Sequence, residues 1–128
     1  MKFPVKSYLP GIAWFFFLLI LLCLPGTDLP EADSWMKFIY FDKIIHACLF
    51  GTLAFLFMLP ISSSTADTRE KWIYVILITI STSVWGLSTE FIQKFLVSGR
   101  SFEFSDWVAD SVGAIIALII NRKFYLRT

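Results

Sequence analysis

Four long apolar stretches, separated by short polar or turn-rich segments, dominate the pattern of this chain. They cover residues 8–24, 41–61, 72–96 and 105–121. A helix of about 17 to 25 apolar residues crosses the hydrocarbon core of a bilayer, so each stretch is long enough for one crossing. The pattern therefore predicts an all-α fold, a four-helix transmembrane bundle in which residues 1–128 form a single domain.

The composition agrees with a membrane protein and argues against one large class of function. Hydrophobic residues make up 57% of the chain and charged residues only 16%, whereas a soluble domain is about a quarter charged. The net charge of +1 and the lack of a basic stripe argue against nucleic acid as a partner. Membrane lipid is the partner that the composition implies, and a homo-oligomer stays open.

Cysteine and histidine usage predicts no metal site and no cofactor. Cys23 and Cys48 both fall inside apolar runs, and His46 is the only histidine. Structural zinc sites use cysteines and histidines at short paired spacings, which this chain lacks. A metal held by His46 and nearby acids is the less favoured interpretation, because one histidine among acids more often forms a hydrogen-bonded pair. A disulfide between the two cysteines stays open.

Lysine and arginine are unevenly shared between the two ends of the spans. Of the 11 in the chain, seven lie before the first span, between the second and third, or after the fourth: Lys2, Lys6, Arg69, Lys71, Arg122, Lys123 and Arg127. Because short cytoplasmic segments are enriched in these residues, we expect both termini in the cytoplasm and the first and third connections outside. The first connection, residues 25–41, becomes amphipathic and is expected to lie along the outer interface.

Polar residues gather where the second, third and fourth spans reach the outer side. The candidate ligand-binding residues are Asp42, Lys43, His46, Glu90, Gln93, Arg100, Asp106 and Asp110. A charged side chain within a span is unfavourable and normally faces the bundle interior, with a partner. Since the topology brings these residues to one membrane depth, we predict a polar pocket at the outer leaflet. The same residue types suit an acid–base or phosphate-handling enzyme, with His46, Glu90 and Asp106 as the catalytic candidates.

Helical spacing predicts which of these side chains share a face. Residues three or four apart are neighbours on a helix surface. The polar edges expected from this rule are Asp42 with His46, Asp106 with Asp110, and Glu90 with Gln93 and Lys94. Small residues four apart permit close helix contact, and they recur on two spans: Ala47 and Gly51, then Ala109, Gly113 and Ala117. Ser105 is expected to cap the start of the fourth span.

Two stretches, DKIIHACLFGTLAF and STEFIQKFLVSGRSFEFSDWVADSVGAIIA, resemble the VanZ-like membrane proteins, a family named after a teicoplanin-resistance factor. The family pattern is D-K-x-x-H, E-x-x-Q, a G-R turn and D-x-x-x-(N or D)-x-x-G. The matching residues are Asp42, Lys43 and His46; Glu90 and Gln93; Gly99 and Arg100; and Asp106, Asp110 and Gly113. The resemblance covers about residues 38 to 120. Two positions depart from the pattern: Ser98 stands where proline often precedes the G-R pair, and asparagine is often found where Asp110 stands.

The resemblance implies an integral protein of the bacterial cytoplasmic membrane with a link to reduced susceptibility to lipoglycopeptides. It supplies no settled reaction, so whether the chain is an enzyme stays open. The favoured hypothesis is a site that binds or modifies a lipid head group, a cell-wall precursor or a glycopeptide. The alternatives are a purely structural polar cluster in a scaffold protein, an acid–base enzyme that uses Arg100 as an anion clamp, and a small proton-coupled transporter.

Overall fold

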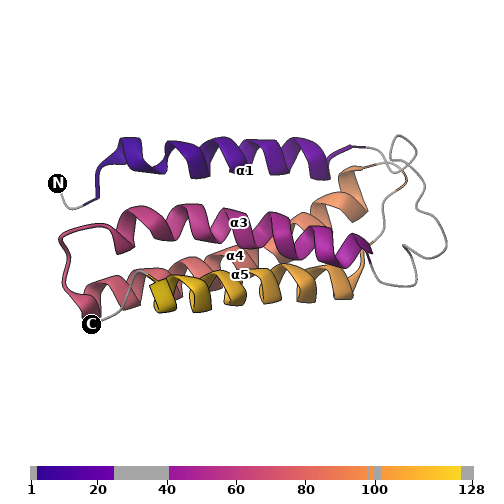
Figure 1. The fold of residues 1–128 in the computed structure, drawn as a ribbon. Coiled ribbons are helices and arrows are strands. Elements are labelled where there is room, and N and C mark those ends of the chain that lie inside the picture. The colour runs from indigo at the N-terminus through magenta and orange to yellow at the C-terminus, as the bar shows by residue number, and fades with distance from the viewer. Residues whose placement is uncertain (1–2, 25–40, 98, 100–101, 125–128) are drawn as a thin grey trace.

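Four long helices make up most of the chain (Figure 1). The computed structural model describes residues 3–24, 41–97, 99 and 102–124. The elements are η1 (Val5–Tyr8), α1 (Leu9–Leu22), α3 (Phe41–Ser62), α4 (Thr68–Leu96) and α5 (Phe104–Phe124). By length and composition, α1 with η1, α3, α4 and α5 can each cross a membrane. The predicted all-α architecture with four spans is therefore confirmed.

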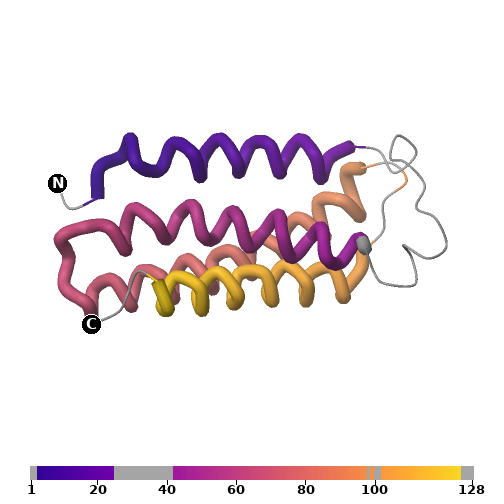
Figure 2. The backbone as a smooth tube through the Cα atoms, in the orientation of Figure 1, coloured from indigo at the N-terminus to yellow at the C-terminus, as the bar shows by residue number. Residues whose placement is uncertain are grey.

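Successive helices run in opposite directions along one bundle (Figure 2). The ends of α1 and α4 consequently lie beside the starts of α3 and α5, and this end of the bundle is called the polar end below. The first connection, residues 25–40, for which an interfacial amphipathic segment is predicted, lies outside the described residues. Cys23 and Cys48 are both free and exposed, which decides against a disulfide between them.

The starts of α4 and α5 are capped in different ways. Asp67, just before α4, accepts a hydrogen bond from the Glu70 amide at 2.8 Å, which is a local cap. The prediction that Ser105 caps the fourth span is wrong, because α5 already begins at Phe104. The amide of Glu103, directly before α5, instead donates to the Glu90 carboxylate of α4 at 3.1 Å. A carboxylate of α4 thus satisfies an amide at the start of α5, where the sequence analysis expected the Ser105 hydroxyl to act as the cap.

The closest helix contact is between α3 and α5, through the predicted small residues. A Cβ atom added to Gly51 would lie 3.0 Å from the Gly113 carbonyl oxygen, and one added to Gly113 would lie only 2.1 Å from the Ala47 carbonyl oxygen. Backbone therefore packs directly on backbone, as small residues at four-residue spacing permit in membrane helices. This close approach brings His46 of α3 and Asp110 of α5 within hydrogen-bonding distance of each other.

Helix α1 packs against α3 and reaches α4 through a few larger side chains. Trp14 donates its indole N–H to the Leu49 carbonyl of α3 at 3.0 Å. Phe15 lies against Trp85 of α4, with ring centroids 4.9 Å apart. At the end of the bundle opposite the polar end, the Ser62 hydroxyl donates to the buried Asn121 side chain at 2.7 Å. Apolar packing and a few buried polar links together hold the four helices.

Candidate functional site

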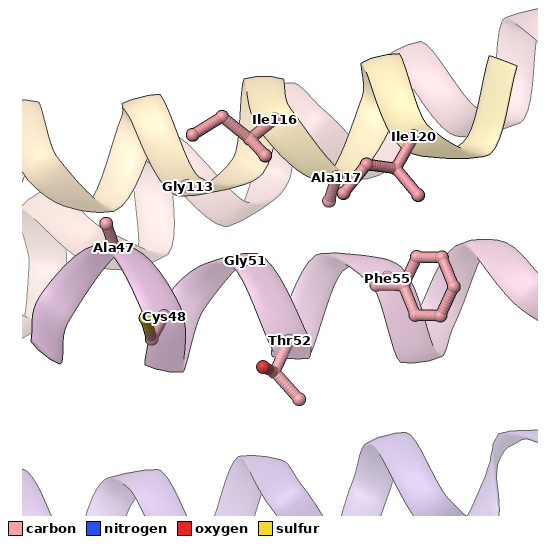
Figure 3. Close-up of a pocket in the computed structure, with 9 residues that line it drawn as sticks. All are labelled: Ala47, Cys48, Gly51, Thr52, Phe55, Gly113, Ile116, Ala117 and Ile120. Atoms are coloured by element: carbon pink, nitrogen blue, oxygen red, sulfur yellow. The ribbon is translucent and has the colours of Figure 1, made fainter. Parts of the chain in front are cut away.

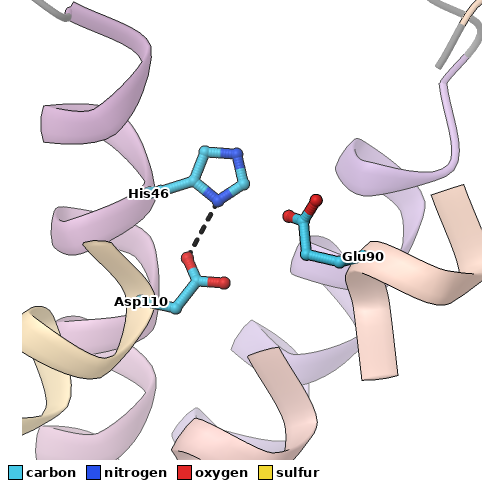
Figure 4. Close-up of side chains that lie close together, drawn as sticks. All are labelled: His46, Glu90 and Asp110. Carbon is cyan, nitrogen blue, oxygen red and sulfur yellow. Dashed lines mark hydrogen bonds and ion pairs between the residues drawn. The ribbon is translucent and has the colours of Figure 1, made fainter. Parts of the chain in front are cut away.

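Three buried side chains from three helices face one another at the polar end (Figure 4). His46 of α3 is 8% exposed, whereas Glu90 of α4 and Asp110 of α5 are fully buried. One nitrogen or oxygen atom from each of the three lies within 4.8 Å of the others. These residues are called the inner trio, and all three belong to the set predicted from the sequence.

The inner trio is organised around the contact between His46 and Asp110. The Nδ1 atom of His46 lies 2.8 Å from Oδ1 of Asp110. The imidazole ring stacks on Phe50 at an interplanar angle of 3°, with centroids 6.3 Å apart. A Cβ atom added to Gly86 of α4 would lie 2.9 Å from Asp110 Oδ2. The missing side chain at Gly86 therefore makes room for the Asp110 carboxylate, and the stacking restricts the imidazole.

Two carboxylate oxygens of the inner trio have no hydrogen-bond partner among the described residues. They are Oε1 of Glu90 and Oδ2 of Asp110. The other oxygen of Glu90 accepts from the Glu103 amide, and the other oxygen of Asp110 contacts His46. Since buried polar groups are nearly always paired, two unpaired oxygens facing one small space call for an explanation.

A second group of acids lies nearer the surface and surrounds one ammonium. Lys43 donates to Asp42 at 2.7 Å, to Glu103 at 2.5 Å and also to Asp106. We call Asp42, Glu103 and Asp106 the outer trio. The Asp42 side chain is 57% exposed and that of Asp106 is 12% exposed, so this layer runs from solvent down toward the inner trio. Asp106 connects the two layers, because its Oδ2 lies 3.5 Å from Nε2 of His46.

The structure does not place every predicted residue in this cluster. Gln93 is buried but donates to the Leu22 carbonyl at 3.1 Å, which satisfies the end of α1. The expected shared edge is wrong for Lys94, which is exposed with its ammonium 5.1 Å from the Phe95 ring centroid. Successive residues differ by about 100° around a helix, so Lys94 points outward when Gln93 faces α1.

Arg100, predicted as an anion clamp, lies outside the described residues, as does Ser98. Gly99 between them has a φ of 75°, a left-handed conformation that suits glycine and fits the predicted tight turn. The role of Arg100 therefore stays a prediction.

Three contributors to the cluster were missed by the sequence analysis. Glu103 bonds Lys43 through its side chain and Glu90 through its amide. Its signal in the sequence is a carboxylate close to the expected start of the fourth span, where the other polar residues gather. Gly86 and Phe50, which hold Asp110 and His46 in place, carry no sequence signal for this role.

An apolar groove lies between α3 and α5 (Figure 3). Its volume is about 360 Å³. The lining residues are Ala47, Cys48, Gly51, Thr52, Phe55, Gly113, Ile116, Ala117 and Ile120. Several of them, including Thr52 and Ile116, are exposed on the bundle surface, so the groove opens outward. Ala47 directly follows His46, and Gly113 is one helical turn beyond Asp110.

The arrangement offers two kinds of chemistry. A carboxylate bonded to an imidazole orients the ring, either for proton transfer or for binding a cation. The catalytic candidates His46, Glu90 and Asp106 all lie in this cluster. The apolar groove is lined by two of the helices that form the cluster, α3 and α5.

Comparison with known proteins identifies a matching family. A family model described as VanZ/LLP1 matches residues 8–125, nearly the whole chain. No curated protein and no solved structure matches.

Proposed function

We propose, from the premise that this chain belongs to the VanZ/LLP1 family, that its polar end binds or modifies a membrane lipid or lipid-linked cell-wall precursor. The family ties this multi-pass membrane protein to teicoplanin resistance. Engagement of such a lipid at the outer leaflet of the bacterial cytoplasmic membrane would alter susceptibility to teicoplanin-type antibiotics.

One observation carries this proposal: the polar cluster and the apolar groove are built on the same two helices, α3 and α5, and the groove's lining begins within one helical turn of His46 and Asp110. Ala47 and Gly113 both line the groove. Ala47 directly follows His46, and Gly113 lies three residues after Asp110. An amphiphile can therefore set a polar head group against the cluster while an acyl chain lies along α3 and α5. Ligand sites commonly combine an apolar lining with a few polar groups. A lipid is the favoured ligand because the groove lies along α3 and α5, two helices long and apolar enough to cross the membrane.

The proposed orientation places the polar end outside and both termini in the cytoplasm. Its support is the bias of lysine and arginine toward the opposite end of the bundle, where Arg69 and Lys71 begin α4 and Arg122 and Lys123 end α5. The outer trio and Lys43 then meet the aqueous side of the outer leaflet.

Cysteine labelling tests this orientation. In a Cys48→Ala variant, Cys23, exposed at the end of α1, is expected to react with a membrane-impermeant maleimide added to spheroplasts. A matched chain with Cys23→Ala, Cys48→Ala and Ser64→Cys carries its only thiol between α3 and α4. That thiol is expected to react only after lysis. The reverse result would overturn the orientation.

A purely structural role for the cluster also has specific support. Gln93 satisfies the end of α1, and Glu90 binds the amide that precedes α5. Under this second candidate, a change at Glu90 would act through the amount of folded protein alone.

Two substitutions separate the candidates. Glu90→Gln keeps an acceptor for the Glu103 amide, so we expect normal folded yield but loss of the resistance phenotype. Thr52→Trp fills the groove and is expected to have the same effect. Val84→Trp, on α4 and 60% exposed, is the matched control and should behave as wild type. The measurement is teicoplanin susceptibility of cells expressing each chain, beside folded yield from size-exclusion chromatography.

The outcomes are distinct. If resistance follows folded yield in every variant, the structural role is correct and the binding proposal fails. If Thr52→Trp alone leaves resistance intact, the groove does not hold the ligand. Turnover of an added lipid by the wild type, abolished by His46→Ala, would identify modification rather than binding alone.

A further inference from the structure

We infer that the inner trio is a binding site for a first-row divalent cation such as Zn²⁺ or Mn²⁺, with His46, Glu90 and Asp110 as its protein ligands. The sequence argues against a metal because it has one histidine and no paired spacing. The fold nevertheless gathers a set of candidate ligands that are far apart in the sequence. It brings one from each of α3, α4 and α5 into one buried space (Figure 4).

The distances suit an ion after a small closure. The candidate ligand atoms lie within 4.8 Å of one another. Zinc binds nitrogen and carboxylate oxygen at about 2.0–2.2 Å, so ligand atoms on a tetrahedral ion are about 3.4 Å apart. The widest pair therefore closes by about 1.4 Å at most. Glu90 can supply this closure by side-chain rotation, because its Oε1 is held by no hydrogen bond among the described residues. The hydrogen bond between His46 Nδ1 and Asp110 Oδ1, 2.8 Å long, is given up where that nitrogen binds the ion.

The unpaired oxygens are an independent sign of a ligand. Oε1 of Glu90 and Oδ2 of Asp110 belong to fully buried side chains, and neither has a hydrogen-bond partner within the described part of the chain. Water cannot freely relieve such groups at membrane depth, so leaving them unpaired is unfavourable by several kcal/mol each, on the order given by transfer data. An ion between them would satisfy both.

The outer trio shows how the same bundle handles converging acids. Asp42, Glu103 and Asp106 surround the Lys43 ammonium, a cation supplied by the chain itself. Across the described residues, no lysine or arginine forms an ion pair with Glu90 or Asp110. Charged side chains within a membrane normally pair with opposite charge. A bound dication would balance the two inner carboxylates as Lys43 balances the outer ones.

The donor set selects the class of ion. An imidazole nitrogen suits zinc or iron, whereas magnesium and calcium prefer oxygen alone. The two carboxylates also suit manganese. Three protein ligands leave a further coordination position, as in catalytic zinc sites. The inference stands on the inner trio and does not depend on the lipid proposed above.

Metal analysis of the purified chain in detergent tests the inference. The protein is stripped with EDTA, reloaded with Zn²⁺ or Mn²⁺, desalted and measured by plasma mass spectrometry, with no lipid substrate added. We expect about one ion per wild-type chain and at least a tenfold loss in Glu90→Gln and in Asp110→Asn. Glu103→Gln is the matched control: it removes an outer-trio carboxylate, keeps the amide that binds Glu90, and should retain the ion.

A spectroscopic readout keeps the test decisive if an isosteric variant does not fold. Pulsed electron paramagnetic resonance of the Mn²⁺-loaded wild type should show coupling to one imidazole nitrogen, which His46→Gln should abolish. Retention of no ion by the wild type would overturn the inference. So would equal retention by Glu90→Gln and Glu103→Gln, or a bound ion without nitrogen coupling. A chain that binds the ion but no lipid would overturn only the proposed function.

Discussion

Replacing Asp110 by alanine is expected to destabilise the folded bundle by about 3–5 kcal/mol, as breaking one partner of a buried pair does. Asp110 is fully buried, and its Oδ1 lies 2.8 Å from His46 Nδ1. The change leaves the His46 ring without that partner and opens a cavity beside Gly86. Thermal unfolding in detergent, with EDTA present to exclude any contribution from bound ions, measures the loss.

The control for this prediction is the same change at an exposed acid. Asp42→Ala removes a side chain that is 57% exposed, and Lys43 keeps Glu103 and Asp106 as partners. Its effect on the unfolding temperature should be much smaller than that of Asp110→Ala. Asp110→Asn, which can still hydrogen-bond His46, should fall between the two. Equal effects of Asp42→Ala and Asp110→Ala would show that the buried contact does not stabilise the bundle.

Replacing Gly113 by alanine is expected to lower stability by about 1–3 kcal/mol or more, as overpacking of a close contact does. The added methyl would lie 2.1 Å from the Ala47 carbonyl oxygen and 3.0 Å from the Ala47 Cα atom. These are backbone atoms, so α3 and α5 must move apart. The sign of the change in stability is informative, because replacing glycine by alanine in an unconstrained helix stabilises it by about 1 kcal/mol.

Gly11→Ala is the matched control for this second prediction. The new methyl there would meet the Phe57 ring at 3.0 Å, and that side chain can turn away. Folded yield and unfolding temperature should therefore change little in Gly11→Ala and fall clearly in Gly113→Ala. If Gly113→Ala unfolds at or above the wild-type temperature, then the contact between α3 and α5 is looser than described. The separation of the helices should also weaken the contact between His46 and Asp110.

The sequence by itself determined the number of spans, the helical class and the meeting of polar residues at one end. The bilayer is the reason: its thickness requires long apolar helices, and its low polarity makes charges at span ends conspicuous. The small residues Ala47, Gly51 and Gly113 likewise marked helix faces that permit a close contact. The structure is what pairs them with each other, between α3 and α5.

Only the tertiary structure decided how the polar residues divide into layers. It assigned Asp106 to Lys43 and Asp110 to His46, although the two aspartates are one helical turn apart. It turned Lys94 outward and let Glu90 meet the amide of Glu103. Helical periodicity states which residues share a face, but the partner of that face depends on how each helix is rotated and tilted against its neighbours. Those quantities arise from packing across the whole bundle, which no local stretch of sequence encodes.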